Sequence, residues 1–449
     1  MSILDKKLNK IDVFSIVLGS IIGWGSFMLP GTKFLKEAGV INTTIGLFLG
    51  ALFIIIIQSS YYIMLENHNN EGGEFSFTYK HCGRNHGFIV GWFLLLAYLT
   101  IIPLNGTAFP LVIRKIFGDV FQFGYLYSIA GYQVFLGEII LSNLIVLLFA
   151  YINIKGIKES AKVQNVIALV LVSLVFIVFT IMYIKVDRTK FLNNYIYNYK
   201  FNLGHVLKVF AITPFAFVGF DNIPQICKEY EFGPKTASII AVLSVLIGAS
   251  IYSILNLTTA LVYTPEEALA LDWALGTGVL VTLGKFGFLL LVIALSAAVT
   301  SGINGFMIST SKLMGSISNH KMVPEKYGYV NENGAYKNAI LFATTISLIA
   351  PWFGREVILW IVDMSSLGAA IAYFYVCLIA FRLGDNLFRR TMSALGVGAS
   401  LLTILLLLVP GSPAALGRES LIALALWVVL GIIFYMKVVS NYKTSAAKK

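Results

Sequence analysis

The stretch Gly19-Ser20-Ile21-Ile22-Gly23-Trp24-Gly25-Ser26-Phe27-Met28-Leu29-Pro30 is the most informative part of this sequence. It lies within the first long apolar segment, residues 13–35, and places glycines and a proline near the middle of that segment. Inside a helix, glycine costs about 1 kcal/mol relative to alanine and proline about 3 kcal/mol. Unwound backbone is tolerated within a bilayer only where it lines a cavity or is buried in protein. The stretch therefore has two interpretations: a ligand site built from backbone, or a kinked helix that serves packing.

The composition places the chain in a membrane. Of its 449 residues, 58% are hydrophobic and only 12% are charged, and the mean hydropathy is +0.82, whereas soluble domains carry about 25% charged residues. About 20 apolar residues cross the hydrocarbon core of a bilayer. The sequence thus predicts an all-α integral membrane protein with about twelve transmembrane helices, at residues 13–35, 41–65, 87–113, 134–154, 163–184, 205–227, 236–263, 279–311, 338–353, 356–381, 393–410 and 419–437.

Positive charges predict the orientation of these spans. With the N-terminus inside, roughly two thirds of the Lys and Arg residues fall in cytoplasmic segments, as the positive-inside rule requires. We therefore expect a multi-pass protein of the cytoplasmic (plasma) membrane with both termini in the cytoplasm. The net charge of +11 follows mostly from this bias, so we expect a lipid bilayer and no nucleic acid as a partner.

No arrangement of residues in the sequence predicts catalysis. The five histidines lie in loops or at span ends, and no metal-ligand spacing, nucleophile–base constellation or phosphate-binding loop is present. The cysteines Cys82, Cys227 and Cys377 are not placed to form a disulfide on the outer face. We expect neither an enzyme nor an organic cofactor.

A second interrupted span, Pro214-Phe215-Ala216-Phe217-Val218-Gly219-Phe220-Asp221-Asn222-Ile223-Pro224, matches the first. Gly25 and Pro30 have the same spacing as Gly219 and Pro224. An odd number of spans separates the starts of the two segments, so they would cross the membrane in opposite directions. Paired Gly/Pro-interrupted spans in matching positions of two halves are the best sequence indication of a transporter site at the membrane midplane.

The inverted repeat divides the chain into predicted parts. They are a cytoplasmic N-terminus (1–10), a first five-helix repeat (11–186), an outer loop (187–204), a second, inverted five-helix repeat (205–382), two additional helices (383–437) and a cytoplasmic tail (438–449). Between the second and third spans, the polar and aromatic residues of 66–86 predict a short helix at the membrane interface.

Broken helices expose the two kinds of backbone pole that a zwitterion needs. Free N–H groups at the start of one half-helix suit a carboxylate, and free carbonyls at the end of the other suit an ammonium or a metal cation. Sugars need many side-chain donors and acceptors, which these spans lack. An amino acid is therefore the preferred class of substrate.

Two acidic residues are candidates for coupling transport to a cation or a proton. Asp221 lies inside the second break, where it is either a functional carboxylate or, with Asn222, a helix cap. Asp363 lies about two helical turns into the tenth span from Glu356. It is either a coupling site or gate, or a residue in a water-filled outer vestibule.

A third group combines small polar residues with aromatic ones. Ala297, Thr300 and Ser301 share one helical face at spacing i, i+3, i+4. Their carbonyl and hydroxyl oxygens suit a small cation, while small residues at this spacing also permit close helix packing. The aromatic residues that could close a pocket around an apolar side chain are Phe215, Phe217, Phe306 and Trp24.

These residues resemble the signatures of the amino acid–polyamine–organocation (APC) superfamily of permeases. Residues 19–25 with Phe27 and Pro30 are similar to the first-helix signature, and residues 215–221 to the sixth-helix signature, which usually ends in glutamate. The family's glycine-rich inner loop and third-helix start are matched by Gly72-Gly73-Glu74 and Gly91-Trp92. The resemblance covers nearly the whole chain. It implies a leucine-transporter-like 5+5 inverted repeat plus two extra helices, with helices 1 and 6 broken, and transport by alternating access.

The resemblance also implies roles for individual residues. The substrate carboxylate is expected at the amides around Gly25 and Ser26, and its ammonium at the carbonyls of Ile21, Phe215 and Val218. Phe306 is expected over the substrate side chain, with Phe217 or Phe220 as a gate. Gly23, Trp24 and Gly219 complete the predicted substrate-binding set.

Two differences from the family bear on the coupling ion. Asp221 stands in place of the usual glutamate and is one methylene shorter. Some proton-driven members carry a fifth-helix lysine at the sodium position, where the best-matching residue here is Leu171. The residues that resemble the sodium site of sodium-coupled relatives are Gly19 and Ile22, through their carbonyls, with Ala297, Thr300 and Ser301. A sodium ion is thereby slightly favoured over a proton, and exchange stays open.

The predicted function is secondary active transport of a neutral or apolar amino acid, coupled to a sodium or proton gradient. No second acid is evident in the sequence to hold a cationic side chain. The alternative is a polyamine or cationic amino acid exchanger, in which Asp221 or Asp363 receives the extra charge. A transport-dead nutrient sensor is disfavoured because the chain has no large cytoplasmic domain. A monomer and a homodimer are both compatible with the sequence.

Overall fold

The computed structural model describes residues 7–68, 70–197, 199–412 and 414–446, and side chains only as far as residue 437. The predicted terminal segments 1–10 and 438–449 therefore lie partly outside the described residues.

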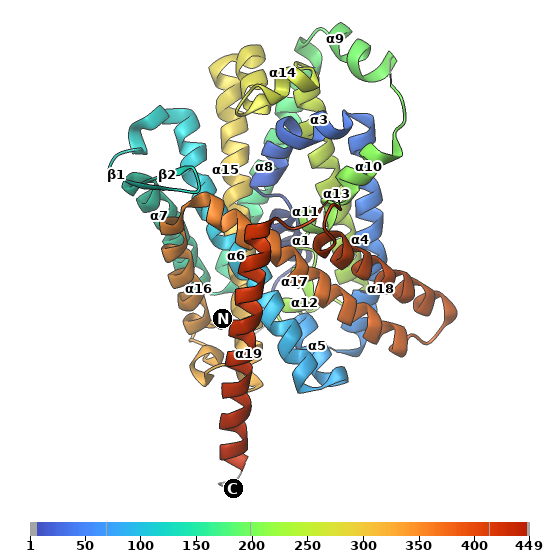
Figure 1. Ribbon diagram of the computed structural model, residues 1–449, viewed down its shortest axis with the longest axis vertical. Coiled ribbons are helices and arrows are strands. Elements are labelled where there is room, and N and C mark those ends of the chain that lie inside the picture. The colour runs from blue at the N-terminus through green and yellow to red at the C-terminus, as the bar shows by residue number, and fades with distance from the viewer. Residues whose placement is uncertain (1–6, 69, 198, 413, 447–449) are drawn as a thin grey trace.

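The chain folds into a bundle of long helices, which confirms the predicted all-α class (Figure 1). The elements of its first part are α1 (Lys10–Ile21), α2 (Trp24–Leu29), η2 (Pro30–Phe34), α3 (Leu35–Ala38), α4 (Ile41–Asn67), α5 (Gly73–Cys82), α6 (Arg84–Phe117), η3 (Gly118–Phe121), β1 (Tyr125–Ile129), β2 (Tyr132–Phe135), α7 (Leu136–Ile154), α8 (Ile157–Lys185), α9 (Thr189–Phe191) and η4 (Leu192–Tyr197). The two strands form an antiparallel hairpin.

The second part of the chain contains a second set of helices, several of them short. They are α10 (Leu203–Phe210), α11 (Thr213–Ala216), α12 (Asn222–Gln225), α13 (Pro234–Ala260), α14 (Pro265–Leu269), α15 (Ala274–Asn319), η5 (Glu325–Gly328), α16 (Lys337–Ile349), η6 (Ala350–Phe353), α17 (Gly354–Leu383), α18 (Leu387–Leu408) and α19 (Arg418–Ala446).

Within the described ranges, nine helices are long and apolar enough to cross a membrane, or ten when the bent pair Lys10–Ile21 and Trp24–Ala38 counts as one span. The predicted spans 338–353 and 356–381 fall in one helical unit, Lys337–Leu383, which η6 interrupts. The predicted span 205–227 is not among them because it is divided into α10, α11 and α12. The difference from the twelve predicted spans thus comes from one merged pair and one fragmented span.

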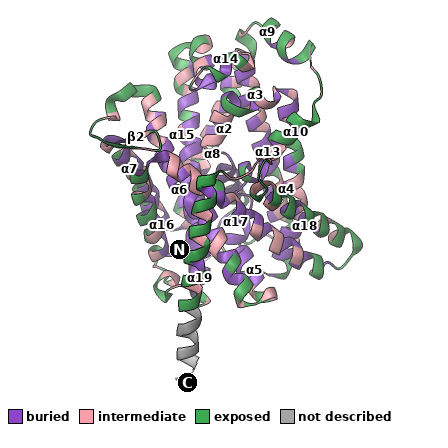
Figure 2. Cartoon of the chain, viewed as in Figure 1, coloured by how far each residue is buried: buried purple, intermediate pink, exposed green. Residues whose placement is uncertain are grey.

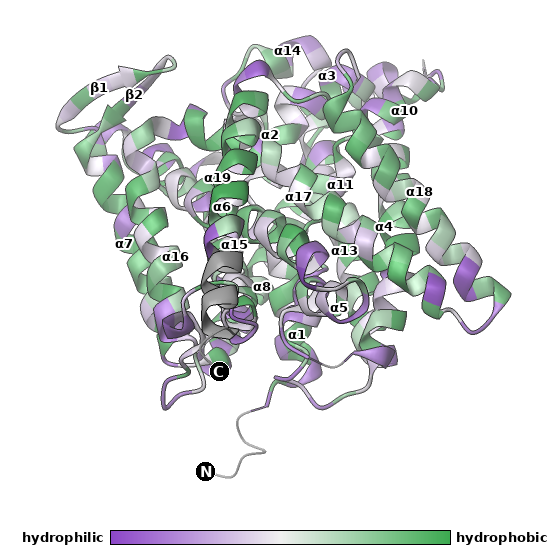
Figure 3. Ribbon diagram, turned by 60° about the horizontal axis from the view of Figure 1, so that its bottom comes forward, coloured by the Kyte–Doolittle hydropathy of each residue, from purple (hydrophilic) through white to green (hydrophobic). Residues whose placement is uncertain are grey.

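Large apolar side chains lie on the outside of the bundle as well as in its core, as a bilayer requires. The core is continuous through the middle of the bundle (Figure 2). Hydrophobic residues also cover the outer faces of the long helices, and hydrophilic residues gather towards the ends of the bundle (Figure 3). Exposed apolar residues on α7, α8 and α15 include Leu144, Leu148, Val166, Leu169 and Val281.

The first helix lies in the centre of the bundle, where it packs against α8, α13 and α15. The hairpin β1–β2, α9 and α14 lie towards one end of the molecule, here called the hairpin end, and α5 lies towards the other, the α5 end (Figure 1). The break between α1 and α2 therefore falls inside the bundle, between the two ends.

The helix predicted at the membrane interface, α5, is instead buried in the protein. It packs against α6 and α17, and Glu74, Phe75 and Phe77 are all 0% exposed. The sequence pattern suggested an interface because polar and aromatic residues alternate in it, but here both kinds face other helices. This burial brings a carboxylate into the core.

Candidate substrate site

The first helix is interrupted near the centre of the bundle. The two parts, Lys10–Ile21 and Trp24–Ala38, are bent by 48°, and Ile22 and Gly23 between them have extended backbone. The last carbonyls of a helix and its first N–H groups lack partners within the helix, so the break exposes carbonyls on one side and amides on the other. Pro30 is not part of the break, because it begins the π-helical turn η2 within the second half.

The sixth span is interrupted over a longer stretch. Between α11 and α12 the chain runs through turns at 217–221, and Gly219 has φ of 127°, in the region that favours glycine. The N–H of Val218 donates to the carbonyl of Phe215 at 3.2 Å. The Phe215 carbonyl thus accepts a hydrogen bond within this turn. The other two predicted ammonium acceptors are the carbonyls of Ile21, at the end of α1, and of Val218, in the interrupted sixth span.

The two breaks are in contact with each other. A Cβ on Gly219 would come within 2.7 Å of Ser20 Cβ and 3.0 Å of the Ile21 nitrogen. Beside it, the Asn222 side-chain amide donates to Ser20 Oγ at 2.7 Å. The amides that begin α2 and the carbonyls that end α1 therefore lie next to the irregular backbone of the sixth span.

Asp221 is fully buried behind this contact, at 0% exposure. Its carboxylate accepts from the N–H of Gly219 at 2.8 Å and from the hydroxyl of Tyr98 at 2.9 Å. Asp221 occupies the position before α12, but its side chain makes no capping hydrogen bond there. The capping alternative is therefore wrong, and the carboxylate instead ties Gly219 to α6.

Glu74 is a second buried carboxylate that the sequence analysis missed as a site residue. It is 0% exposed and accepts from the hydroxyl of Tyr61 at 2.8 Å and from the Gln225 amide at 2.6 Å. Glu74 and Asp221 act on each other electrostatically, and all the donors found for them are neutral. The signal that could have found Glu74 is its place between two glycines and two phenylalanines, which is unusual for an exposed acid.

The predicted sodium site contains a side-chain amide. The Gln164 amide nitrogen, from α8, donates to Ser301 Oγ and, at 3.1 Å, to the carbonyl of Ser15. A Cβ on Gly19 would overlap both Ser301 Oγ and this nitrogen. The Gln164 donor, on α8, thus lies between two of the residues expected to hold a cation.

The other residues of this predicted set lie nearby with different partners. The Thr300 hydroxyl donates to the carbonyls of Ser296 and Ala297, at 2.8 and 3.2 Å. The carbonyl of Ala297 is therefore already used within α15. The backbone of Ile22, by contrast, is extended at the break itself.

The predicted aromatic residues divide between the core and the surface. Phe306, at 1% exposure, has its ring 5.8 Å from that of Tyr98, and so reaches the surroundings of Asp221. Both predicted gates are 0% exposed: Phe220 packs 5.3 Å from the rings of Tyr61 and Tyr373, and Phe217 packs 6.2 Å from Tyr252. Phe215 is 36% exposed.

Asp363 is not brought together with these residues. It is exposed, and Lys33 acts on it electrostatically. This separates Asp363 from the buried pair Glu74 and Asp221, and both interpretations of Asp363, as a coupling site or as a vestibule residue, stay predictions.

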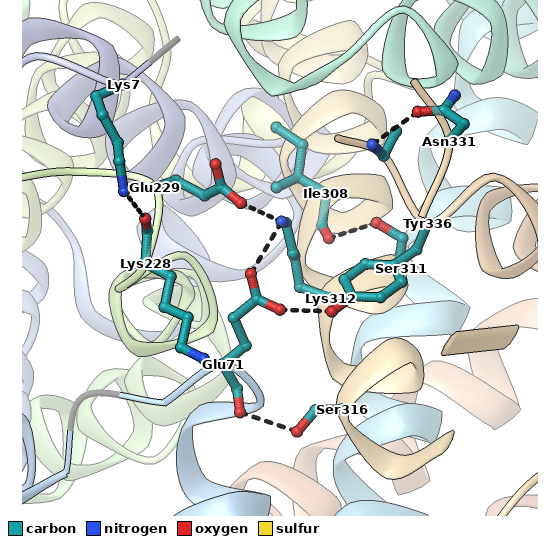
Figure 4. Close-up of polar contacts among 11 residues, drawn as sticks. Lys7, Glu71, Lys228, Glu229, Ile308, Ser311, Lys312, Ser316, Asn331 and Tyr336 are labelled. Atoms are coloured by element: carbon teal, nitrogen blue, oxygen red, sulfur yellow. Dashed lines mark hydrogen bonds and ion pairs between the residues drawn. The ribbon is translucent and has the colours of Figure 1, made fainter. Parts of the chain in front are cut away.

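An ion cluster joins α15 to the segments before α5 and after α12 (Figure 4). Lys312, on α15, pairs with Glu71 at 3.2 Å and also with Glu229. The hydroxyl of Tyr336 donates to Glu71 at 2.6 Å. Burial raises the pKa of Glu71, but Lys312 and Tyr336 outweigh it, so the pKa lies below its usual value. The N–H of Leu8 donates to the carbonyl of Glu229 at 2.7 Å, which fixes the N-terminal segment to the same cluster.

Comparison with known proteins identifies the family. The family model for amino acid permeases matches residues 8–434. The branched-chain amino acid permease BcaP of Bacillus subtilis is 23% identical over 448 residues, which cover 96% of this chain and 92% of that protein. BcaP of Lactococcus lactis is 23% identical over 394 residues, 83% of this chain and 82% of that protein.

A further relative is named for a different class of substrate. The vacuolar cationic amino acid transporter 4 of Arabidopsis thaliana is 24% identical over 266 residues, 56% of this chain and 42% of that protein. The match to the family model covers nearly the whole chain, including both helix breaks. The chain therefore belongs to the amino acid permease family of the APC superfamily.

Proposed function

We propose that this permease carries a neutral, apolar amino acid across the membrane by alternating access, driven by a proton gradient. The observation that carries the proposal is the contact of Gly219 with Ser20 and Ile21. It sets the amides that begin α2 and the carbonyls that end α1 beside a second irregular segment. These opposite poles match the carboxylate and the ammonium of a zwitterion.

A neutral side chain is favoured by what surrounds the two breaks. Phe306 and Phe220 are buried there, and the carboxylates of Glu74 and Asp221 are engaged by the donors described above. Neither carboxylate has an exposed oxygen to offer a cationic side chain. The names of the two BcaP relatives point to the same class, since branched-chain amino acids are neutral and apolar.

A proton is favoured over sodium by two side chains. The Gln164 amide donates at the place where Gly19 and Ser301 were expected to bind a cation. Asp221 is buried with neutral donors only, and a carboxylate in that setting gains from taking up a proton. Because Asp221 accepts from Gly219 N–H, its protonation would loosen the segment that packs on the first break.

We infer alternating access from the two facing helix breaks, which lie in the interior between the two ends of the bundle. The α5 end is held by the pairs that Lys312 makes with Glu71 and Glu229. At the hairpin end, by contrast, the pair of Lys190 on α9 with Glu267 on α14 is exposed. We propose that opening towards the cytoplasm separates this ion cluster, with the N-terminus on the cytoplasmic side.

The test is uptake of radiolabelled leucine into proteoliposomes that contain the purified permease. Accumulation with an inwardly directed proton gradient, in choline medium without sodium, is the expected result. Accumulation that requires sodium, or no leucine uptake under any gradient, would contradict the proposal.

A cationic amino acid or polyamine is the second candidate. The observation that favours it is the presence of two buried carboxylates, Glu74 and Asp221, where the sequence predicted only Asp221. The relative from Arabidopsis thaliana is named as a cationic amino acid transporter. Competition in the same proteoliposomes separates the two candidates, since arginine and spermidine should leave leucine uptake unchanged if the substrate is neutral.

A further inference from the structure

Arg355, the second residue of α17, is a buried cation, and no ion pair joins it to another described residue. Its side chain lies at the hairpin end and the residue is 6% exposed. The Nη1 group donates to the carbonyl of Leu104 and to Thr107 Oγ1, both at 3.0 Å. The Nη2 group has no hydrogen-bond partner in the part of the chain that the structure describes. A buried guanidinium normally requires a compensating charge.

The residues that the structure describes do not supply this charge close by. Glu138 lines the same cavity, but its carboxylate pairs with Arg114 and accepts from the Tyr132 hydroxyl. Burial and the neighbouring Glu138 raise the pKa of Tyr132 to about 12, so this hydroxyl stays neutral. Glu356 acts on Arg355 only at longer range, since no ion pair joins them in the described structure. Arg114 and Arg355 therefore share one nearby carboxylate, that of Glu138, and this carboxylate already pairs with Arg114.

Arg355 lines a small cavity between four elements that are distant in the sequence. Its walls come from α6, the hairpin strand β2, α7 and the segment that leads into α17, and they include Thr107, Tyr132, Ser142 and Pro351. The hairpin covers this place closely, because a Cβ on Gly354 would meet Ile129 at 2.6 Å. Ser142 is 1% exposed, and its hydroxyl has no partner among the described residues. Two residues that each carry an unpaired donor, one of them charged, thus line the same cavity.

The size of the cavity limits the occupant. Its volume is about 20 Å³, and one water needs about 10–15 Å³. An amino acid is far too large for it, so the cavity is separate from the substrate site. A single water would satisfy the donors but would leave the charge of Arg355 uncompensated in a buried setting. A monatomic anion satisfies both.

We propose that this cavity binds one halide ion, with chloride as its natural occupant, held by Arg355 Nη2 and the Ser142 hydroxyl. The position has a structural consequence, because the guanidinium also lies 5.1 Å from the ring of Trp24, the first residue of α2. The bound ion fixes the guanidinium that supports this ring. Halide binding thereby stabilises the arrangement of the hairpin, α6, α7 and α17 around the start of the second half-helix.

The experiment is thermal unfolding of the purified, full-length permease at constant ionic strength, with chloride or bromide replacing gluconate. The expected result is a saturable rise in Tm with either halide in the wild type, absent in Arg355→Gln. Lys115→Gln is the matched control. It also removes one positive charge, but from an exposed residue near the C-terminal end of α6, and it should keep the full response. Equal Tm in halide and gluconate, or an undiminished response in Arg355→Gln, would overturn the proposal.

Two further measurements keep the test decisive if Arg355→Gln does not fold. Ser142→Ala should weaken the apparent chloride affinity about tenfold, the effect of one hydrogen bond to a charged group. Crystals grown in bromide should give an anomalous peak in contact with Arg355 Nη2. Unchanged affinity in Ser142→Ala together with an ordered water and no bromide at this position would show that the cavity is only hydrated.

Discussion

Gly219 packs directly on Ser20, so that a Cβ on Gly219 would lie 2.7 Å from Ser20 Cβ and 2.9 Å from its carbonyl carbon. This contact joins the two interrupted helices in the interior of the bundle. It leaves no room for a side chain on the sixth-helix side, and the positive φ of Gly219 separately disfavours one. The pairing of the breaks is therefore built into the backbone, and it can be tested at single positions.

Gly219→Ala should destabilise the protein by about 1–3 kcal/mol, the usual range for a side chain forced into a sparsely populated backbone region. It should also weaken leucine binding, because the added methyl group separates the two breaks. Gly233→Ala is the matched control, since a Cβ at Gly233 meets nothing within 4 Å. Thermal unfolding and leucine binding on both variants measure the difference, and equal behaviour of the two would contradict the packing argument.

Asp221→Asn keeps an oxygen that can accept from Gly219 N–H but cannot bind a proton at neutral pH. We expect this variant to lose leucine accumulation under a proton gradient while retaining leucine exchange between loaded and unloaded sides. Proteoliposome uptake and counterflow give the two readouts. Accumulation at the wild-type level in Asp221→Asn would remove Asp221 from the coupling mechanism.

Thr300→Ala combined with Ser301→Ala tests the alternative cation site. The Gln164 amide already donates to Ser301, so wild-type uptake should be equal in sodium and choline media, and the double variant should keep this independence. If the wild type depends on sodium and the double variant does not, the site predicted at Gly19, Ile22, Ala297, Thr300 and Ser301 holds the coupling ion.

Lys312→Met should destabilise the permease by about 3–5 kcal/mol, because it leaves carboxylates facing each other without the cation that pairs with them. Lys312 is 5% exposed and pairs with both Glu71 and Glu229. Lys162→Met is the control: its pair with Glu159 is exposed, and such pairs contribute about 0–1 kcal/mol. Chemical unfolding should separate the two variants clearly, and similar losses would mean that the cluster does not hold the α5 end.

The same cluster predicts a dependence of stability on pH. The pKa of Glu71 is lowered in the folded protein, so its contribution is present above the unfolded value and is lost as pH falls through the folded value. The difference in Tm between wild type and Glu71→Gln should therefore be largest near neutral pH and shrink in acid below about pH 4.5. A difference that grows on acidification would contradict the assigned sign.

The sequence was sufficient to predict the all-α fold and the two breaks, because hydropathy and the positions of Gly and Pro are local signals. It was not sufficient to place the partners of these breaks. Gln164 reaches Ser301, and this depends on how α8 is rotated against α1 and α15. Glu74 is buried because α5 packs against α6 and α17, and Arg355 has no ion-pair partner among the described residues although Glu356 follows it in the sequence. Neither follows from local composition.

The most direct test of the central claim is leucine binding to Gly25→Val, measured on purified protein by ligand-induced thermal stabilisation. A Cβ at Gly25 meets only Leu29 and Tyr252, at 3.7 and 3.9 Å, so the variant should fold, but its side chain should cover the amides that begin α2. The account predicts that leucine stabilises the wild type and Gly233→Val, and does not stabilise Gly25→Val. Wild-type leucine affinity in a folded Gly25→Val protein would show that the substrate does not bind at the helix break.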